Sequence, residues 1–263
     1  MVKILEITNL SYKDFNNLSI SFDSGNFYTI VGPNNSGKTT LFNLITGIIL
    51  TNNNISIDNI DLNKNNIDKY IVNLGVVERV NSNSFFYDSV INEMIYPLSN
   101  LGYSKRKALA RINEVLELFS CTSFLDKRIS ELTFYDKQLL LIMIALLHKP
   151  RVLLLDSVLQ VFSKSRQEDI IKIIRKLIGD GLTVISFTNY LTESSYSDKL
   201  LILDKFNIVG EYNYNDIFKD DKVFYEHNLE IPFMTDLSIK LKMYNLVNKE
   251  YTSMKEMVDD IWP

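Results

Sequence analysis

The stretch FYTIVGPNNSGKTTLFNLI, residues 27–45, decides the fold of this 263-residue chain. Residues 27–31 are rich in β-branched and aromatic side chains, which is typical of a short buried strand. Residues 32–39 then fit the pattern G-x-x-x-x-G-K-[ST] at every fixed position. Apolar residues follow at spacings that place one stripe on a helix: Leu41, Phe42, Leu44 and Ile45. A strand, a glycine loop and a helix in this order predict a phosphate-binding site.

Phosphate chemistry explains each residue type in this loop. Backbone N–H groups wrapped around an anion, with the positive end of a helix behind them, hold phosphate without a side-chain cage. Gly32 and Gly37 allow the backbone to approach closely, Lys38 reaches the terminal phosphates, and the Thr39 hydroxyl can ligate Mg²⁺. We therefore predict nucleotide binding by a continuous run of residues: Gly32, Pro33, Asn34, Asn35, Ser36, Gly37, Lys38, Thr39 and Thr40.

Composition and charge argue against several other classes of protein, including nucleic-acid-binding and membrane-spanning proteins. A net charge of −4 without a strongly basic stretch disfavours nucleic acid as a partner. The single cysteine, Cys121, excludes an internal disulfide. The chain opens without a charged segment followed by a long apolar core, so we expect no signal peptide. The longest apolar run, residues 139–147, is too short to span a bilayer, so we expect membrane contact only through partners.

Strands alternate with helices along the chain. We expect further strands at residues 3–7, 18–22, 55–57, 152–155, 182–187 and 200–203, with Asn16 and Asn17 as the turn between the first two. We expect helices at residues 104–119, 133–147 and 167–178. On the first of these helices Lys105, Arg106, Lys107 and Arg111 are interpreted as the solvated face. The pattern predicts a layered α/β fold.

The order and spacing of these motifs resemble the ATP-binding subunits of ABC transporters along nearly the whole chain. The tail, with HNLEIPF at residues 227–233, a segment at 237–246 and another from Met257 to Trp262, is similar to the C-terminal extension of energy-coupling-factor (ECF) A-components. The resemblance implies a P-loop ABC-type domain over residues 1–218, with a mixed sheet, flanking helices and a helical subdomain at about residues 80–148. A small helical extension over residues 219–263 would follow.

The resemblance also implies roles for two residues outside the loop. Tyr12 stands where the family has an aromatic side chain that stacks on adenine, although a tyrosine packed at a strand end is the structural alternative. Asp156 closes the apolar strand at residues 152–155, where the family has the aspartate that holds Mg²⁺. A carboxylate at a buried strand end needs a partner, and a cation at the nucleotide supplies one.

Several positions depart from the family pattern around the nucleotide. Ser157 replaces the catalytic glutamate, and serine cannot act as the general base that activates water. Asn189 replaces the switch histidine, Arg79 falls near the glutamine of the Q-loop, and Ser163 falls at the aspartate of the D-loop. No residue is therefore predicted to be catalytic. Glu78 and Glu193 are the nearby acids that deserve testing.

The ABC signature is the largest departure. The family has L-S-G-G-Q at the start of a helix, and this chain has Leu132 to Asp136, reading LTFYD. In a head-to-tail dimer this segment closes over ATP on the opposite subunit, so Phe134 and Tyr135 add bulk there. Asp136 adds a negative charge, and a like-charge pair at about 4 Å costs on the order of 4 kcal/mol. Thr133 still suits a helix cap.

The resemblance implies a subunit of an importer that couples Mg·ATP binding to uptake of a vitamin or another micronutrient. Its partners would be a paralogous ATP-binding subunit, a transmembrane T-component and a substrate-binding S-component, which would hold the chain at the cytoplasmic face of the membrane. The replaced residues leave open a second hypothesis, an ATP-binding scaffold or regulator that does not hydrolyse ATP. A soluble ABC protein of translation or DNA repair is a third, disfavoured because those proteins lack this tail.

Overall fold

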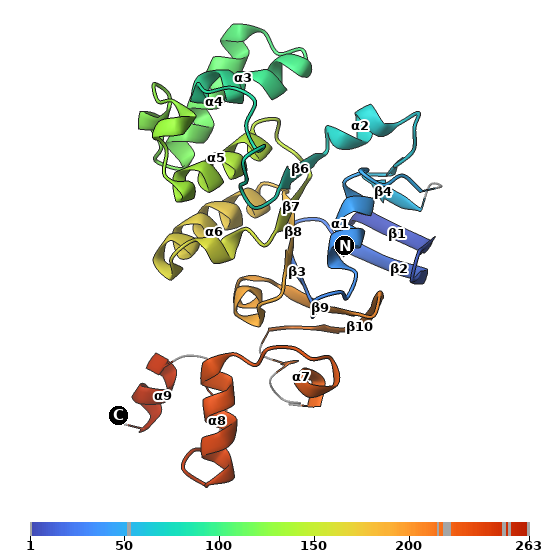
Figure 1. Ribbon diagram of the computed structural model, residues 1–263, viewed down its shortest axis with the longest axis vertical. Helices are drawn as coiled ribbons and strands as arrows, with labels where there is room; N and C mark the ends of the chain where they lie inside the picture. Colours follow the sequence, from blue (N-terminus) through green and yellow to red (C-terminus); the bar gives the residue numbers. More distant parts are fainter. Residues whose placement is uncertain are drawn as a thin grey trace.

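The computed structural model describes residues 2–51, 54–214, 216–217, 222–248, 251 and 254–261, and its strands form two sheets (Figure 1). The strands are β1 (Lys3–Tyr12), β2 (Phe15–Asp23), β3 (Phe27–Val31), β4 (Ile55–Ile57), β5 (Ile60–Asp61), β6 (Leu74–Val77), β7 (Val152–Asp156), β8 (Thr183–Thr188), β9 (Lys199–Asp204) and β10 (Asn207–Tyr212). The helices are α1 (Lys38–Ile45), α2 (Ile67–Ile71), α3 (Val90–Asn100), α4 (Lys105–Leu118), α5 (Phe134–Leu146), α6 (Lys164–Gly179), α7 (Lys222–Glu226), α8 (Phe233–Met243) and α9 (Met254–Ile261).

The larger sheet has the strand order β10-β9-β3-β8-β7-β6, and only β10 runs antiparallel to its neighbour. On β7, Leu153 and Leu155 pack into a core shared with α4, α5 and α6, while Val152 and Leu154 pack into a core shared with α1. The predicted strand that is buried on both faces is therefore confirmed. The smaller sheet, β2-β1-β4-β5, is antiparallel and completes the layer on the α1 side (Figure 1).

The first hairpin differs from the prediction. Its turn lies at Lys13 and Asp14, because β1 and β2 continue until Tyr12 pairs with Phe15. Phe15 is fully buried, so its burial extends the strand beyond the predicted boundary. Asn17 lies inside β2 with φ 53°, next to a shift in the strand register. The asparagines therefore mark an irregularity within the strand and not its end.

Helices α3, α4 and α5 lie together on one side of the larger sheet, within the range where the sequence predicts a helical subdomain (Figure 1). The predicted helix starts are confirmed by side-chain caps: the Ser104 hydroxyl accepts from the Lys107 N–H, and the Thr133 hydroxyl accepts from the Asp136 N–H. Each hydroxyl satisfies a backbone donor that the helix itself leaves unpaired. The two helices therefore begin where local sequence places a capping residue.

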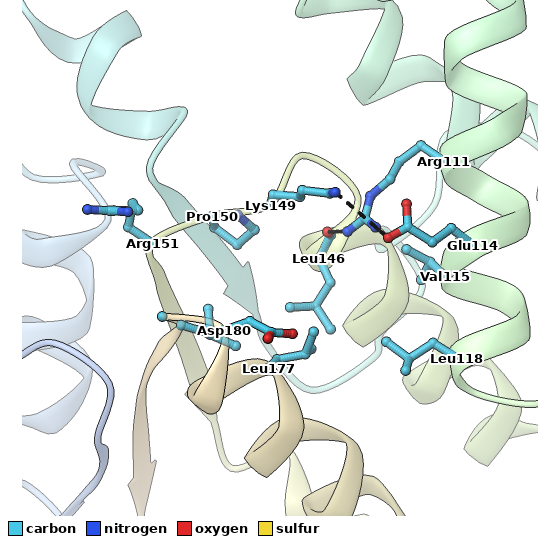
Figure 2. A pocket seen from close by; sticks show the side chains of 12 residues that line it. Arg111, Glu114, Val115, Leu118, Leu146, Lys149, Pro150, Arg151, Leu177 and Asp180 are labelled. Atoms are coloured by element: carbon cyan, nitrogen blue, oxygen red, sulfur yellow. Dashed lines mark hydrogen bonds and ion pairs between the residues drawn. The ribbon is translucent and has the colours of Figure 1, made fainter.

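Arg111 does not belong to a solvated face, which corrects the prediction. Figure 2 shows its guanidinium among side chains from α4 and the end of α5. It donates to the carbonyl oxygens of Leu146 and Leu147, at 2.8 Å each, and pairs with Glu114 at 2.6 Å. The hydrogen bond from Arg111 lowers the pKa of Glu114. Arg111 therefore caps the carboxyl end of α5 and ties it to α4.

The C-terminal helices lie beyond the β9–β10 edge of the larger sheet (Figure 1). Phe224 and Leu229 pack against Leu200 and Ile202 of β9, and the His227 Nδ1 lies 3.1 Å from an Asp204 oxygen. Pro232 separates α7 from α8, as predicted, whereas Trp262 lies outside the described residues. Among the described residues, no helix combines the length and apolar character needed to cross a membrane.

The Arg111 cap yields a stability prediction. We expect Arg111→Ala to lower the free energy of unfolding by about 2 kcal/mol, because two terminal carbonyls lose a charged donor. Denaturant unfolding measures the change. Lys107→Ala is the matched control, since Lys107 is an exposed cation on the same helix. Equal effects of the two substitutions would show that Arg111 does not act as a cap.

Candidate functional site

The glycine loop joins β3 to α1 and is pressed against β9. A Cβ atom added at Gly32 would lie 2.1 Å from the Leu203 carbonyl oxygen, so only glycine fits there. Gly37 has φ 106°, a backbone conformation that other residues rarely adopt. Asn35 takes φ 64°, which asparagine tolerates better than most residues. The loop therefore has the tight backbone geometry that its sequence pattern predicts.

Lys38 lies inside the loop with its ammonium group surrounded by oxygen atoms. Its Nζ donates to the carbonyl oxygens of Gly32 and Pro33, at 2.7 Å each, and to the Ser36 Oγ at 3.2 Å. Burial lowers the pKa of Lys38 to about 8, and the charge of Asp156 opposes the shift. A phosphate in the loop would replace weak neutral acceptors with a charged one. The position of the Lys38 ammonium group therefore suits the binding of an anion such as phosphate.

Asp156 ends β7 beside the loop and is half-buried. Burial raises the pKa of Asp156, while a hydrogen bond from the Ser157 hydroxyl and the charge of Lys38 hold it down. The Ser157 Oγ lies 3.2 Å from Asp156 Oδ1, so the serine supports the aspartate. Ser157 takes φ 54° and its N–H donates to the Phe187 carbonyl. Its short side chain is thus directed back to Asp156.

One cavity of about 480 Å³ brings most of the predicted residues together. Its lining residues come from the loop, from the ends of β7 and β8, and from the turn after β9: Asn34, Asn35, Ser36, Gly37, Lys38, Thr39, Thr40, Asp156, Ser157, Asn189 and Phe206. Gly32 and Pro33 line a neighbouring cavity that Asn34 and Asn189 also line. Sequence reasoning missed Phe206, because a single phenylalanine between β9 and β10 belongs to no motif.

Asn189 connects the switch position to the loop. Its amide nitrogen donates to the Asn34 side-chain oxygen at 3.0 Å. Both side chains are exposed in the cavity wall, one after β8 and the other after β3. Parallel strands β3 and β8 are neighbours, so their carboxyl ends bring the two asparagines together. An asparagine at this position can contact a phosphate by hydrogen bonding, but it cannot carry the proton of a histidine.

The other residues singled out in the sequence lie elsewhere. Tyr12 is half-buried against the core on the α1 side and lines neither cavity. Glu78 and Arg79 are exposed and do not line the cavity of about 480 Å³. Gln138, which sequence reasoning did not single out, is fully buried. It accepts from the Val80 N–H and donates to the Glu78 carbonyl, so it anchors the backbone on both sides of Arg79.

The signature segment keeps the structural part of its role. The Thr133 hydroxyl donates to an Asp136 oxygen at 2.8 Å, and the Asp136 N–H donates back to that hydroxyl at 3.2 Å. The carboxylate therefore lies at the start of α5, where the helix dipole favours a negative charge. Phe134 and Tyr135 are exposed and form an edge-to-face pair at 5.8 Å. The segment presents aromatic surface where the family pattern has glycine.

Glu193 is a buried acid behind the switch position. Its side chain is 3% exposed, and neither carboxylate oxygen has a hydrogen-bond partner among the described residues. Burial raises the pKa of Glu193 to about 7; the Thr188 hydroxyl and the Gln160 N–H oppose the rise, although neither is aligned for a hydrogen bond. The acid does not line the cavity, so it is not placed to activate water there.

The site has the donor set that a magnesium nucleotide requires. The Thr39 hydroxyl and the Asp156 carboxylate are hard oxygen ligands, which Mg²⁺ prefers, and both line the cavity. Lys38 and the loop N–H groups are donors for phosphate. Thr39 and Asp156 would thus hold the cation, which would neutralise phosphate charge, and Lys38 would contact the terminal phosphates. The residues present fit the predicted pair of ATP and Mg²⁺.

A second cavity, of about 440 Å³, lies between α4, the end of α5 and the end of α6 (Figure 2). Four of the five charged residues that line it interact with other groups of the protein. Arg111 binds helix carbonyls, Glu114 pairs with Arg111 and Lys149, and Arg151 lies 3.6 Å from Asp58. Apolar side chains make up much of the remaining wall. We interpret this cavity as a gap between packed helices and not as the functional site.

Comparison with known proteins agrees with this geometry. Residues 15–160 match the family model described as ABC transporter. The chain is 27% identical to the energy-coupling factor transporter ATP-binding protein EcfA1 of Oenococcus oeni, over 99% of this chain and 98% of that protein. It is also 27% identical to the corresponding EcfA protein of Enterococcus faecium, over 100% of this chain and 98% of that protein.

Solved structures show the same fold. The cbiO1 protein of Clostridium perfringens, described as part of the ABC transporter complex cbiONQ, superposes with a TM-score of 0.76. It is 24% identical, and the match covers 89% of this chain and 98% of that one. The ADP conformation of an ATP-binding cassette of an ABC transporter superposes with a TM-score of 0.73 at 22% identity, over 88% of this chain and 100% of that one. The predicted α/β fold class is confirmed.

The burial of Glu193 predicts a pH-dependent stability. Because its pKa rises from 4.5 to about 7 on folding, the folded protein binds the proton more tightly than the unfolded chain over that interval. Stability should therefore fall by about 3 kcal/mol as the pH rises from 4.5 to 7. Denaturant unfolding at several pH values measures this loss. Glu193→Gln should lack the loss, and an unchanged pH profile in that variant would contradict the assignment.

Proposed function

The chain belongs to the ABC transporter family, and on that premise we propose that it is the ATP-binding subunit of an ECF-type importer. The observation that carries the proposal is the shared cavity, in which Lys38, Thr39 and Asp156 meet. A cation inside a glycine loop and two oxygen ligands beside it form a site for Mg·ATP. The likeness to ECF ATP-binding proteins along the whole chain supports the narrower assignment to that branch.

We propose that this subunit binds ATP tightly but hydrolyses it slowly at its own loop. The Ser157 side chain hydrogen-bonds to Asp156 and cannot act as a base. The Asn189 side chain hydrogen-bonds to Asn34 and cannot gain or release a proton as a histidine can. The buried Glu193 does not line the cavity, so it is not proposed as a replacement base. A positioned base typically contributes 10²–10⁴-fold, and the slow rate follows from its absence.

The proposed assembly is a head-to-tail pair with a paralogous ATP-binding subunit. The two subunits would dock on a transmembrane T-component, and an S-component in the membrane would choose the vitamin or other micronutrient. These partners would hold the chain at the cytoplasmic face of the membrane. In such a pair the partner's loop would face Phe134 and Tyr135, which are exposed as a contact surface requires. Their bulk would also impair hydrolysis on the partner.

A second candidate function is an ATP-binding scaffold or regulator without turnover. The bonding of Ser157 and Asn189 to their neighbours favours it, because both family positions are occupied by supporting side chains. Vanadate-sensitive hydrolysis in the assembled complex, abolished by Lys38→Ala, would exclude this alternative. ATP binding without any such turnover would favour it over the importer with slow hydrolysis.

Removal of the Lys38 ammonium group tests the binding site itself. We expect Lys38→Ala to weaken Mg·ATP binding at least tenfold, because the loop loses its charge-assisted contact with the phosphates. Titration calorimetry on the purified chain measures the dissociation constant. Lys64→Ala is the matched control, since Lys64 is exposed in a loop away from the cavity. Unchanged affinity in Lys38→Ala would exclude the proposed site.

Restoring a base tests why hydrolysis is slow. We expect Ser157→Glu to raise ATP turnover at least tenfold over the natural chain in the assembled complex, because a carboxylate would reach the cavity beside Asp156. Phosphate release measures the rate, and Ser123→Glu serves as the control for an added charge at an exposed position outside the cavity wall. Equal turnover by the natural chain and Ser157→Glu would show that position 157 does not limit hydrolysis.

A further inference from the structure

Glu193 lies between the two chain segments that follow β7 and β8. The Gln160 N–H, from the segment after β7, and the Thr188 hydroxyl, at the end of β8, both face its carboxylate. The same two segments supply Ser157 and Asn189 to the wall of the proposed nucleotide cavity. The acid therefore lies directly behind the cavity wall, although it does not line the cavity itself.

The carboxylate is close to donors but is not bonded to them. Glu193 belongs to the 3₁₀ helix Leu191–Tyr196, which packs against β3, and its side chain is 3% exposed. Neither of its oxygens has a hydrogen-bond partner among the described residues. The neighbouring strands β3 and β8 contain no lysine or arginine that could pair with it. Buried polar groups without partners are rare, and each one calls for a structural or functional explanation.

The titratable groups around Glu193 explain why it retains a proton near neutral pH. Burial is the main cause that raises its pKa to about 7, and the negative charge of Asp156 at the end of β7 adds to the rise. Tyr196 on the same helix stays neutral, because burial raises its pKa as well. Neither β8 nor the 3₁₀ helix Leu159–Val161 contains an ionisable residue, and Tyr28 of β3 packs into the core on the α1 side. Asp156 is therefore the charged group that acts on Glu193.

Nucleotide binding would change these surroundings. Mg²⁺ held by Asp156 would reverse the charge that faces the acid, while Lys38 and the loop N–H groups would match the charge of the phosphates. We propose that Glu193 is a positioning residue: when Mg·ATP binds, it releases its proton to solvent, and its carboxylate accepts hydrogen bonds from the Gln160 N–H and the Thr188 hydroxyl. The segments after β7 and β8 are then tied together behind the nucleotide. The inference rests on the proposed nucleotide site.

A proton released on binding makes the affinity depend on pH. The bound state favours the carboxylate, so the pKa of Glu193 falls from about 7 on binding, and the affinity rises as the pH rises through that value. Between pH 6 and pH 8 the dissociation constant for Mg·ATP should fall about tenfold more in the natural chain than in Glu193→Gln. At pH 7 the natural chain should release about half a proton more per ATP. Lys38 and the nucleotide titrate in both proteins, so the comparison cancels them.

Titration calorimetry on the full chain, in buffers of different ionisation enthalpy, measures the affinity and the released protons together. Glu168→Gln is the matched control, because it removes an exposed acid from α6 and should keep the natural pH profile. Thr188→Val should release fewer protons, because the ionised Glu193 loses a donor. Thr188→Ser keeps the hydroxyl and should match the natural chain.

The outcomes separate the inference from the proposed function. Equal pH profiles and equal proton release in the natural chain and Glu193→Gln would overturn the inference, while the binding of Mg·ATP would stand. A loss of affinity in Glu193→Gln that is the same at every pH would also overturn it, since the acid would then only support the fold. Natural proton release by Thr188→Val would contradict the proposed contact with the hydroxyl. If the natural chain bound no Mg·ATP at any of these pH values, the proposed function itself would fail.

Discussion

The close approach of Gly32 to the Leu203 carbonyl oxygen is the constraint on which the rest of the site depends. There is no room for a side chain between the loop and β9, so the loop is seated on the central strands of the larger sheet. The carboxyl ends of the parallel strands then meet at one edge, which brings Asp156 from β7 and Asn189 from β8 to the loop. Ligand sites of open α/β sheets form at such an edge.

Burial around this edge gives the site its electrostatic character. Desolvation lowers the pKa of Lys38 and raises the pKa values of Asp156 and Glu193. The charged form of each group is therefore less stable in the folded protein than it is in water. Such groups cost the folded protein stability, and a magnesium nucleotide would restore favourable partners to Lys38 and Asp156. The same burial that favours nucleotide binding thus lowers the stability of the nucleotide-free protein.

The replaced residues show how structural and chemical roles separate. Thr133 and Asp136 still cap a helix, although the glycines of the family signature are absent. Ser157 bonds to Asp156 where a base would stand, and Asn189 bonds to Asn34 where a histidine would sense phosphate. In each case the new side chain is satisfied by a neighbour within the protein. The fold and the cavity beside the glycine loop persist, and we propose that hydrolysis there is slow because these positions do not carry the family's residues.

The sequence by itself determined the features that rest on local pattern: the loop at residues 32–39, the doubly buried strand β7, and the helix starts at Ser104 and Thr133. Short-range periodicity and capping chemistry are sufficient for those. Only the tertiary structure decided that the first hairpin turns at Lys13–Asp14, that Arg111 caps α5, and that Phe206 lines the cavity. Each of these features depends on a contact with a residue distant in the chain, or on the burial of a side chain between paired strands. Local sequence patterns do not reveal such contacts.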